Sequence, residues 1–184
     1  MNIEGIFKSV AIKRSIVFSA ASIACAVLLA LSALVKFSVP GSPVPATLQT
    51  FALLALSGVL GRYYALQMVG WYVLLGILGA PFFAEGAGWQ HLIGATGGYI
   101  WGFFLAAWVV SVLSQRTNNL RERVFVYMVA ALALYIPGLL QLKAVTGDDW
   151  TGTLQMGLYP FVFVDMFKAL LAASGVCLTS RLFK

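Results

Sequence analysis

Long uncharged, largely apolar stretches alternate with short polar or charged segments along the chain. The first stretch runs from Ser15 to Val35, 21 residues between Arg14 and Lys36. As an α-helix it would be about 31 Å long, which matches the hydrocarbon thickness of a lipid bilayer. A cleavable signal peptide has an apolar core of only about 7–15 residues and then a small-residue cleavage site, so we interpret this stretch as a membrane span.

Five further stretches of this kind follow, and the pattern predicts an all-α integral membrane protein with six transmembrane helices. The predicted spans are residues 15–35, 46–61, 63–80, 92–114, 124–142 and 154–180. The second span is expected to start near Ala46, because Pro40, Pro43 and Pro45 lack a backbone N–H and favour extended backbone before them. Pro137 predicts a kink in the fifth span.

The residues before the first span have a different pattern. Ile3, Ile6, Phe7 and Val10 recur at helical spacing within residues 2–13, with polar residues between them. This pattern is typical of an amphipathic helix that lies in the membrane interface. We expect residues 1–184 to form a single membrane domain that includes this helix.

The composition agrees with a membrane protein and indicates its orientation. Of the 184 residues 61% are hydrophobic and 10% are charged, whereas soluble domains carry about 25% charged residues. With six spans both termini lie on one side, and that side holds nine of the twelve basic residues against two, Lys36 and Lys143, on the other. By the positive-inside rule both termini are predicted to be cytoplasmic, in the cytoplasmic membrane of a bacterium. The basic residues form no single patch, so nucleic acid is not an expected partner.

Few residues are suited to metal or covalent chemistry. Cys25 and Cys177 lie within apolar stretches, and the one histidine, His91, has no cluster of carboxylates around it. We therefore expect no disulfide, no metal site and no cofactor. The chain also lacks a phosphate-binding GxxxxGK[ST] segment, so it is not expected to hydrolyse ATP itself.

One charged pair lies inside a predicted span. Asp165 and Lys168 both fall within residues 154–180, and each would cost about 2.5–3.5 kcal/mol at the centre of a lipid-facing helix. Three residues apart, they share a helix face and can form an ion pair that only tolerates burial. Intramembrane charges that face a bundle interior usually mark a ligand or ion path, and we favour a ligand site. Asp165 and Lys168 together suit a ureido or amide group, whereas a carboxylate would need Lys168 alone; the sequence does not separate these ligands.

Two predicted outward loops carry further candidates. Glycines of the loop over residues 79–98, among them Gly86 and Gly88, allow the backbone to approach a ligand, although glycines also allow close helix packing. Thr47 and Gln49 follow the proline segment, where Gln49 can hydrogen-bond a ligand and Thr47 can contact a ligand or cap the second helix. Aromatic residues can supply apolar walls or an interfacial belt. They are Trp71, Tyr72, Trp89, Tyr99, Trp101 and Tyr159.

Four ordered segments resemble a known family. They are Val44-Pro-Ala-Thr-Leu-Gln-Thr-Phe-Ala-Leu, Gly76-Ile-Leu-Gly-Ala-Pro-Phe-Phe-Ala, Gly94-Ala-Thr-Gly-Gly-Tyr-Ile-Trp-Gly-Phe and Asp165-Met-Phe-Lys-Ala-Leu-Leu-Ala. In this order and spacing they resemble BioY, the biotin-binding S component of energy-coupling-factor vitamin transporters, over about residues 15–182.

The resemblance implies a six-helix S-component bundle that takes up biotin with high affinity and is not an enzyme. It implies that Asp165 and Lys168 lie at the ureido ring and that two loops close over the vitamin. The remaining residues expected to line the site are Thr47, Gln49, Glu85, Gly86, Gly88 and Tyr99.

The resemblance also implies partners. S components dock through small residues of the first helix onto a coupling subunit that is driven by two ATPases, and Ala20 and Ala24 supply such a face, as do Ala26 and Ala30. Some family members are thought to work without this module. The other functions that we consider are an S component for another vitamin, an intramembrane enzyme that uses Asp165, and a non-transporting scaffold.

Overall fold

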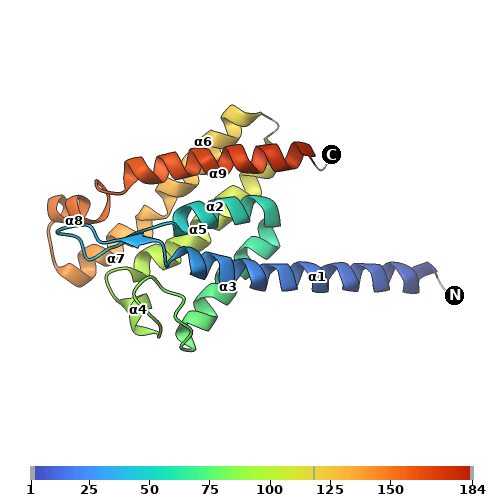
Figure 1. Cartoon of the computed structure of the whole chain (residues 1–184), viewed down its shortest axis with the longest axis horizontal. Helices are drawn as coiled ribbons and strands as arrows, with labels where there is room; N and C mark the ends of the chain where they lie inside the picture. Colours follow the sequence, from blue (N-terminus) through green and yellow to red (C-terminus); the bar gives the residue numbers. More distant parts are fainter. Residues whose placement is uncertain (1–2, 118, 183–184) are drawn as a thin grey trace.

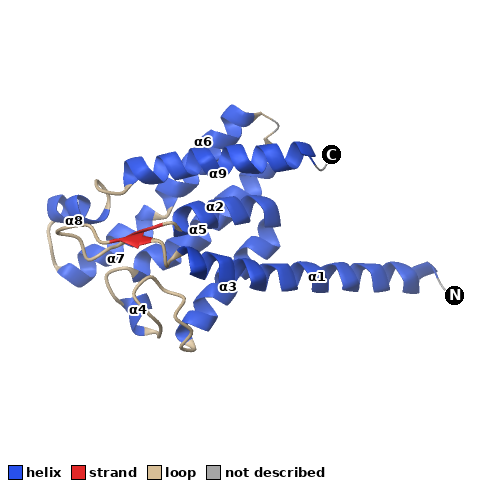
Figure 2. Ribbon diagram, in the orientation of Figure 1, coloured by secondary structure: helices blue, strands red, loops and turns tan. Residues whose placement is uncertain are grey.

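The structure is a computed structural model that describes residues 3–117 and 119–182, with side chains for residues 15–117 and 119–179. Helices dominate the described part, with one short β-hairpin (Figure 2). The elements are, in chain order, α1 (Ile3–Ser32), β1 (Lys36–Phe37), β2 (Ala46–Thr47), α2 (Gln49–Leu60), α3 (Arg62–Ile77), α4 (Gln90–Ile93), α5 (Gly97–Leu113), the single 3-10 turn η1 (Ser114–Arg116), α6 (Leu120–Ala133), α7 (Tyr135–Thr146), α8 (Trp150–Gly157) and α9 (Val162–Leu182).

The chain termini lie at one end of the bundle, and the hairpin and the short helices lie at the other. Figure 1 shows α1 extending beyond the other helices toward the N-terminus, and α9 ending toward the same end of the molecule. The β1–β2 hairpin, α4 and α8 lie at the opposite end. The loops that the sequence analysis singled out are therefore gathered at one end of the bundle.

Helix α5 lies at the centre and contacts α2, α3, α6 and α7. Two glycines allow α7 to approach it closely, because a Cβ on Gly98 would collide with the carbonyl of Pro137 and one on Gly102 with the backbone of Leu134. A Cβ on Gly97 would likewise collide with the carbonyl of Leu92. Of the two uses we considered for the glycines at the start of this helix, close backbone packing accounts for Gly97 and Gly98.

Two predicted spans are interrupted. The stretch 124–142 falls into α6 and α7, which meet at Leu134; the cause is Pro137, whose ring crowds the carbonyl four residues earlier, on Ala133. The kink predicted at this proline is confirmed at that point of the helix.

The stretch 154–180 falls into α8 and α9 with a turn at residues 158–161. Pro160 in this turn lacks a backbone N–H for an α-helical bond. In addition, α8 starts earlier than the predicted span, at a cap where Asp149 accepts a hydrogen bond from the N–H of Gly152 at 2.8 Å. The last long helix thus begins at Val162, eight residues later than the sequence pattern suggested.

Within the described residues, four helical segments are long and apolar enough to cross a bilayer: Ser15–Ser32, Gly97–Arg116, Leu120–Thr146 and Val162–Thr179. Helices α2 and α3 have 12 and 16 residues, about 18 Å and 24 Å in length, and are shorter than a full span. Residues 3–13 continue directly into the first of the four segments within α1. Residue 2 and the side chains of the predicted amphipathic segment lie outside the described residues.

Candidate functional site

A cavity opens between the hairpin and the helices at the loop end of the bundle. Its walls combine the β1–β2 hairpin region, α2, α3, α5, α7, the 158–161 turn and α9. The lining residues are Val44, Pro45, Ala46, Thr47, Gln49, Thr50, Tyr72, Phe83, Ala84, Thr96, Tyr99, Ile100, Phe103, Leu134, Tyr135, Pro160, Phe161, Val164, Asp165 and Lys168.

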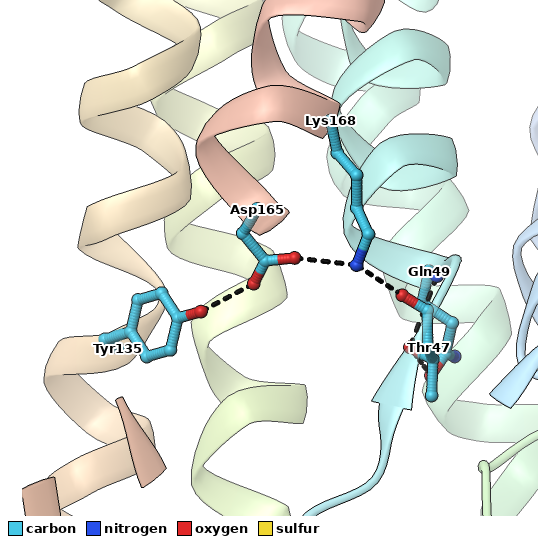
Figure 3. Close-up of polar contacts among 5 residues, drawn as sticks. All are labelled: Thr47, Gln49, Tyr135, Asp165 and Lys168. Atoms are coloured by element: carbon cyan, nitrogen blue, oxygen red, sulfur yellow. Dashed lines mark hydrogen bonds and ion pairs between the residues drawn. The ribbon is translucent and has the colours of Figure 1, made fainter. Parts of the chain in front are cut away.

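Asp165 and Lys168 lie in this wall as an ion pair. Lys168 Nζ is 2.8 Å from Asp165 Oδ1 and donates a second hydrogen bond, at 2.7 Å, to the carbonyl of Thr47. The hydroxyl of Tyr135 donates to the other carboxylate oxygen at 2.5 Å, and Figure 3 shows these contacts in one row across the site. Asp165 is only 6% exposed, and both of its oxygens have a donor, so the carboxylate can stay charged in an apolar wall.

The start of α9 places this pair near the loop end of the bundle. Asp165 lies in the first turn of α9, and its N–H donates to the carbonyl of Phe161. The helix dipole favours a carboxylate at this position. The apolar pattern of residues 154–180 predicts the pair well within the last span, because the pattern does not reveal the turn at Pro160.

Three more predicted residues line the cavity and are fixed by hydrogen bonds. Gln49 Nε2 donates to the hydroxyl of Tyr72 at 2.8 Å, and the Tyr99 hydroxyl donates to the carbonyl of Gly157 at 2.9 Å. The hydroxyl of Thr47 accepts from the N–H of Gln49 at 3.2 Å, while its carbonyl holds Lys168. Thr47 therefore both stabilises the entry to α2 and lies in the cavity wall.

The predicted residues of the 79–94 loop lie outside the lining. Glu85 is exposed, and Gly86 and Gly88 have φ of 136° and 102°, values that favour glycine. Gly86 pairs with Phe83 through two backbone hydrogen bonds of 3.0 Å. This tight turn holds Phe83 and Ala84 in the cavity wall. The glycines therefore position lining residues without lining the cavity themselves.

Sequence reasoning missed three polar lining residues, Thr50, Thr96 and Tyr135, of which Tyr135 bonds the charged pair. Tyr135 is the first residue of α7, directly after the break at Leu134. Its one signal is an aromatic side chain two residues before the kinking Pro137. Of the aromatic candidates, Tyr72 and Tyr99 line the cavity; the others do not, and they are Trp71, Trp89, Trp101 and Tyr159.

The site has unused hydrogen-bonding capacity beside an apolar surface. The Lys168 ammonium has three N–H groups, of which two are used, and each oxygen of Asp165 can accept one more bond. The hydroxyl of Tyr72 accepts from Gln49 and can still donate. Phe83, Ile100 and Phe103 supply the apolar part. The arrangement suits a small ligand whose polar head carries both donors and an acceptor.

Metal sites and acid–base catalysis place requirements on the side chains of a site. Among the residues that the structure describes, no three His, Cys, Asp or Glu side chains lie close enough to hold a metal ion. Asp165 is also the one carboxylate in the lining of the cavity, whereas acid–base catalysis needs a partner group near the reacting atoms.

The two small-residue pairs of α1 have different surroundings. Ala26 and Ala30 are 0% and 5% exposed and pack into the core. Ala20 and Ala24 are exposed, on the opposite side of the helix. A face for another protein can therefore include Ala20 and Ala24, but not the second pair.

Comparisons with known proteins agree on one family. The family model described as the BioY family matches residues 8–184. The chain is 37% identical, over 141 residues, to the protein named biotin transporter BioY of Thermotoga maritima, and the match covers 74% of this chain and 80% of that one. It is 34% identical, over 143 residues, to biotin transporter BioY2 of Lactococcus lactis subsp. cremoris, covering 77% and 79%.

The fold also matches a solved structure. The crystal structure of the S component for biotin from an ECF-type ABC transporter superimposes with a TM-score of 0.82, over 92% of this chain and 93% of that one. The sequence identity is 19%, so this likeness concerns the fold.

Proposed function

The chain belongs to the BioY family, and we propose that it is a multi-pass membrane protein that binds biotin in the cavity at the loop end of the bundle and serves its uptake. The observation that carries the proposal is the Asp165–Lys168 pair, held at 2.8 Å in an apolar wall with hydrogen-bonding capacity to spare. Relatives that are 37% and 34% identical are named biotin transporters. Biotin is then the transported substrate, and neither a cofactor nor an enzymatic reaction is involved.

The polar head of biotin is a ureido ring with two N–H donors and one carbonyl acceptor. In our proposal a ureido N–H donates to Asp165 and the carbonyl accepts the remaining N–H of Lys168, as charge-assisted hydrogen bonds. The fused sulfur ring and the hydrocarbon chain contact the walls at Phe83, Ile100 and Phe103. These roles fit a neutral polar head better than a carboxylate, which would meet the negative charge of Asp165.

The other residues expected at the site complete this arrangement. Thr47, Gln49 and Tyr99 form the wall around the ring, since all three line the cavity. Glu85, Gly86 and Gly88 belong to the loop beside Ala84, a lining residue. We propose that these three contact biotin only if the loop moves toward the cavity upon binding.

We propose six spans, in which the short helices α2 and α3 also cross the membrane, with both termini in the cytoplasm. Nine of the twelve basic residues fall on the side of the termini in this topology, as the positive-inside rule requires. The cavity then faces outward, on the side from which a vitamin enters the cell. The membrane is the cytoplasmic membrane of a bacterium, and the first residues of α1, which continue the helix of the first span, lie on its cytoplasmic side.

Energy for uptake would come from partner proteins. A crystal structure with the same fold is that of an S component from an ECF-type ABC transporter. We propose that Ala20 and Ala24, both exposed on α1, contact a coupling subunit that works with two ATPases. Small residues at such a face let two helices approach closely.

Binding of labelled biotin to the purified protein tests the proposal. We expect a dissociation constant below the micromolar range, and we expect Asp165→Asn and Lys168→Ala to abolish binding at that range while the protein stays folded. Asp148→Asn serves as the matched control, because Asp148 is exposed and lies outside the cavity lining. The proposal would be contradicted if the wild-type protein bound no labelled biotin at submicromolar concentrations. It would also be contradicted if excess thiamine or riboflavin displaced labelled biotin as well as excess unlabelled biotin does.

A further inference from the structure

The proposed ligand brings a charge that the pair in the cavity does not balance. Asp165 and Lys168 neutralise each other at 2.8 Å. Biotin, which we take as ligand on the strength of the proposed function, ends in a carboxylate that is ionised at neutral pH. A carboxylate at the rim of the cavity is partly removed from water, and a cation beside it stabilises it there.

Lys36 is placed for this role by the hairpin. It lies in β1 and pairs in register with Thr47 of β2, a lining residue of the cavity. Its Nζ donates to the carbonyl of Ala84, another lining residue, at 2.5 Å. Lys36 is exposed and Ala84 is half-buried, so the ammonium lies where the cavity wall meets solvent.

Within the described part of the chain, Lys36 forms no ion pair. The one ion pair recorded there joins Asp165 and Lys168, and Lys36 bonds a neutral carbonyl. Its ammonium retains two further N–H groups. A carboxylate that arrives at the rim can take these without displacing a protein carboxylate.

The other basic residue on the same predicted side has a different setting. The Nζ of Lys143 donates to the carbonyl of Asp148 at 2.8 Å and lies 5.3 Å from the centre of the Trp150 ring. None of these three residues lines the cavity, whereas Lys36, itself outside the lining, bonds one lining residue and pairs with another. Lys143 is therefore a matched control, with the same charge on the same side but away from the site.

We propose that Lys36 is a specificity-determining residue that binds the carboxylate of the ligand at the rim of the cavity. The ligand is then held at both ends, the ureido ring by Asp165 and Lys168 and the acid tail by Lys36. Through its bond to Ala84, Lys36 also links the hairpin to the loop over residues 79–98. The site therefore selects acids over neutral derivatives of the same ring system.

The test compares biotin with biotin methyl ester, which has the same ring and a neutral tail. An ion pair that is open to solvent contributes about 0.2–1 kcal/mol, which corresponds to a factor of up to about five in affinity. We expect the wild type to bind the acid up to about fivefold more tightly than the ester. We expect Lys36→Met to bind acid and ester with the same affinity, and Lys36→Arg to keep the preference for the acid. Lys143→Met should match the wild type. The preference should also shrink as salt is raised, because the rim is open to solvent.

The outcomes separate this assignment from the proposed function. A wild type that binds neither compound overturns both. A wild type that binds both compounds equally, or a Lys36→Met variant that keeps the full preference, overturns the role of Lys36 alone. An equal loss for acid and ester in Lys36→Met also overturns it, because that result means the side chain only ties the hairpin to the loop.

Discussion

Replacing Tyr135 by phenylalanine removes one hydroxyl and keeps the ring. The hydroxyl donates to Asp165 Oδ2 at 2.5 Å, while the ring packs edge-to-face on Tyr99 with centroids 6.0 Å apart. Hydrogen bonds to a charged group contribute about 1.5–3 kcal/mol, and bonds between neutral groups about 0.5–1.5 kcal/mol. We expect Tyr135→Phe to lower the free energy of unfolding of the ligand-free protein by about 2 kcal/mol, because a buried carboxylate oxygen loses its donor.

Tyr99→Phe is a matched comparison, since the hydroxyl of Tyr99 donates to a neutral carbonyl, that of Gly157, at 2.9 Å. We expect this variant to cost about half as much. Unfolding in mixed detergent micelles, monitored by tryptophan fluorescence, gives both values. A double-mutant cycle adds Asp165→Asn, in which a neutral acceptor replaces the carboxylate. In that background, Tyr135→Phe should lower the free energy of unfolding only as much as Tyr99→Phe does. Equal costs for the two tyrosine variants in the wild-type background would refute the view that Tyr135 stabilises a charged Asp165.

Two further predictions concern the loop and the first helix. Gln141 Nε2 donates to the carbonyls of Leu92 and Gly94, each at 2.8 Å. Because Gln141→Leu removes both bonds, it should increase amide hydrogen exchange in residues 90–96. Unchanged exchange would mean that packing alone holds the loop. Ala20→Leu with Ala24→Leu should leave biotin binding intact but abolish uptake that depends on the partner proteins, whereas Ala26→Leu, at a fully buried position, should destabilise the protein itself. Unimpaired uptake by the double variant would exclude this face as the contact.

The sequence predicted features that depend on local composition. The long apolar stretch of α1 is visible residue by residue, and Asp165 and Lys168 stand out because they are charges inside a predicted span. Their pairing follows from helical spacing alone. Thr47 and Gln49 follow directly on a stiff proline segment, which gave a local reason to expect them near the site.

The sequence did not predict features that depend on contacts between distant segments. The bond from Tyr135 to Asp165 joins residues 30 apart, and it requires both the break before α7 and the turn before α9. Those two interruptions come from Pro137 and Pro160, of which only the first was interpreted as a kink. The resemblance implies that Glu85, Gly86 and Gly88 line the site, but Phe83 and Ala84 of the same loop line the cavity.

The unequal lengths of neighbouring helices have a consequence for the surrounding lipid. The apolar part of α1, Ser15–Ser32, has 18 residues and is about 27 Å long, while α3, which packs against α1, has 16 residues and is about 24 Å long. A helix longer than the bilayer can tilt or extend into the headgroups, whereas a shorter one draws the two leaflets together around it. In the six-span topology that we propose, the bilayer is therefore thinner beside α3 than beside α1, and acyl-chain length becomes a variable to which this protein responds.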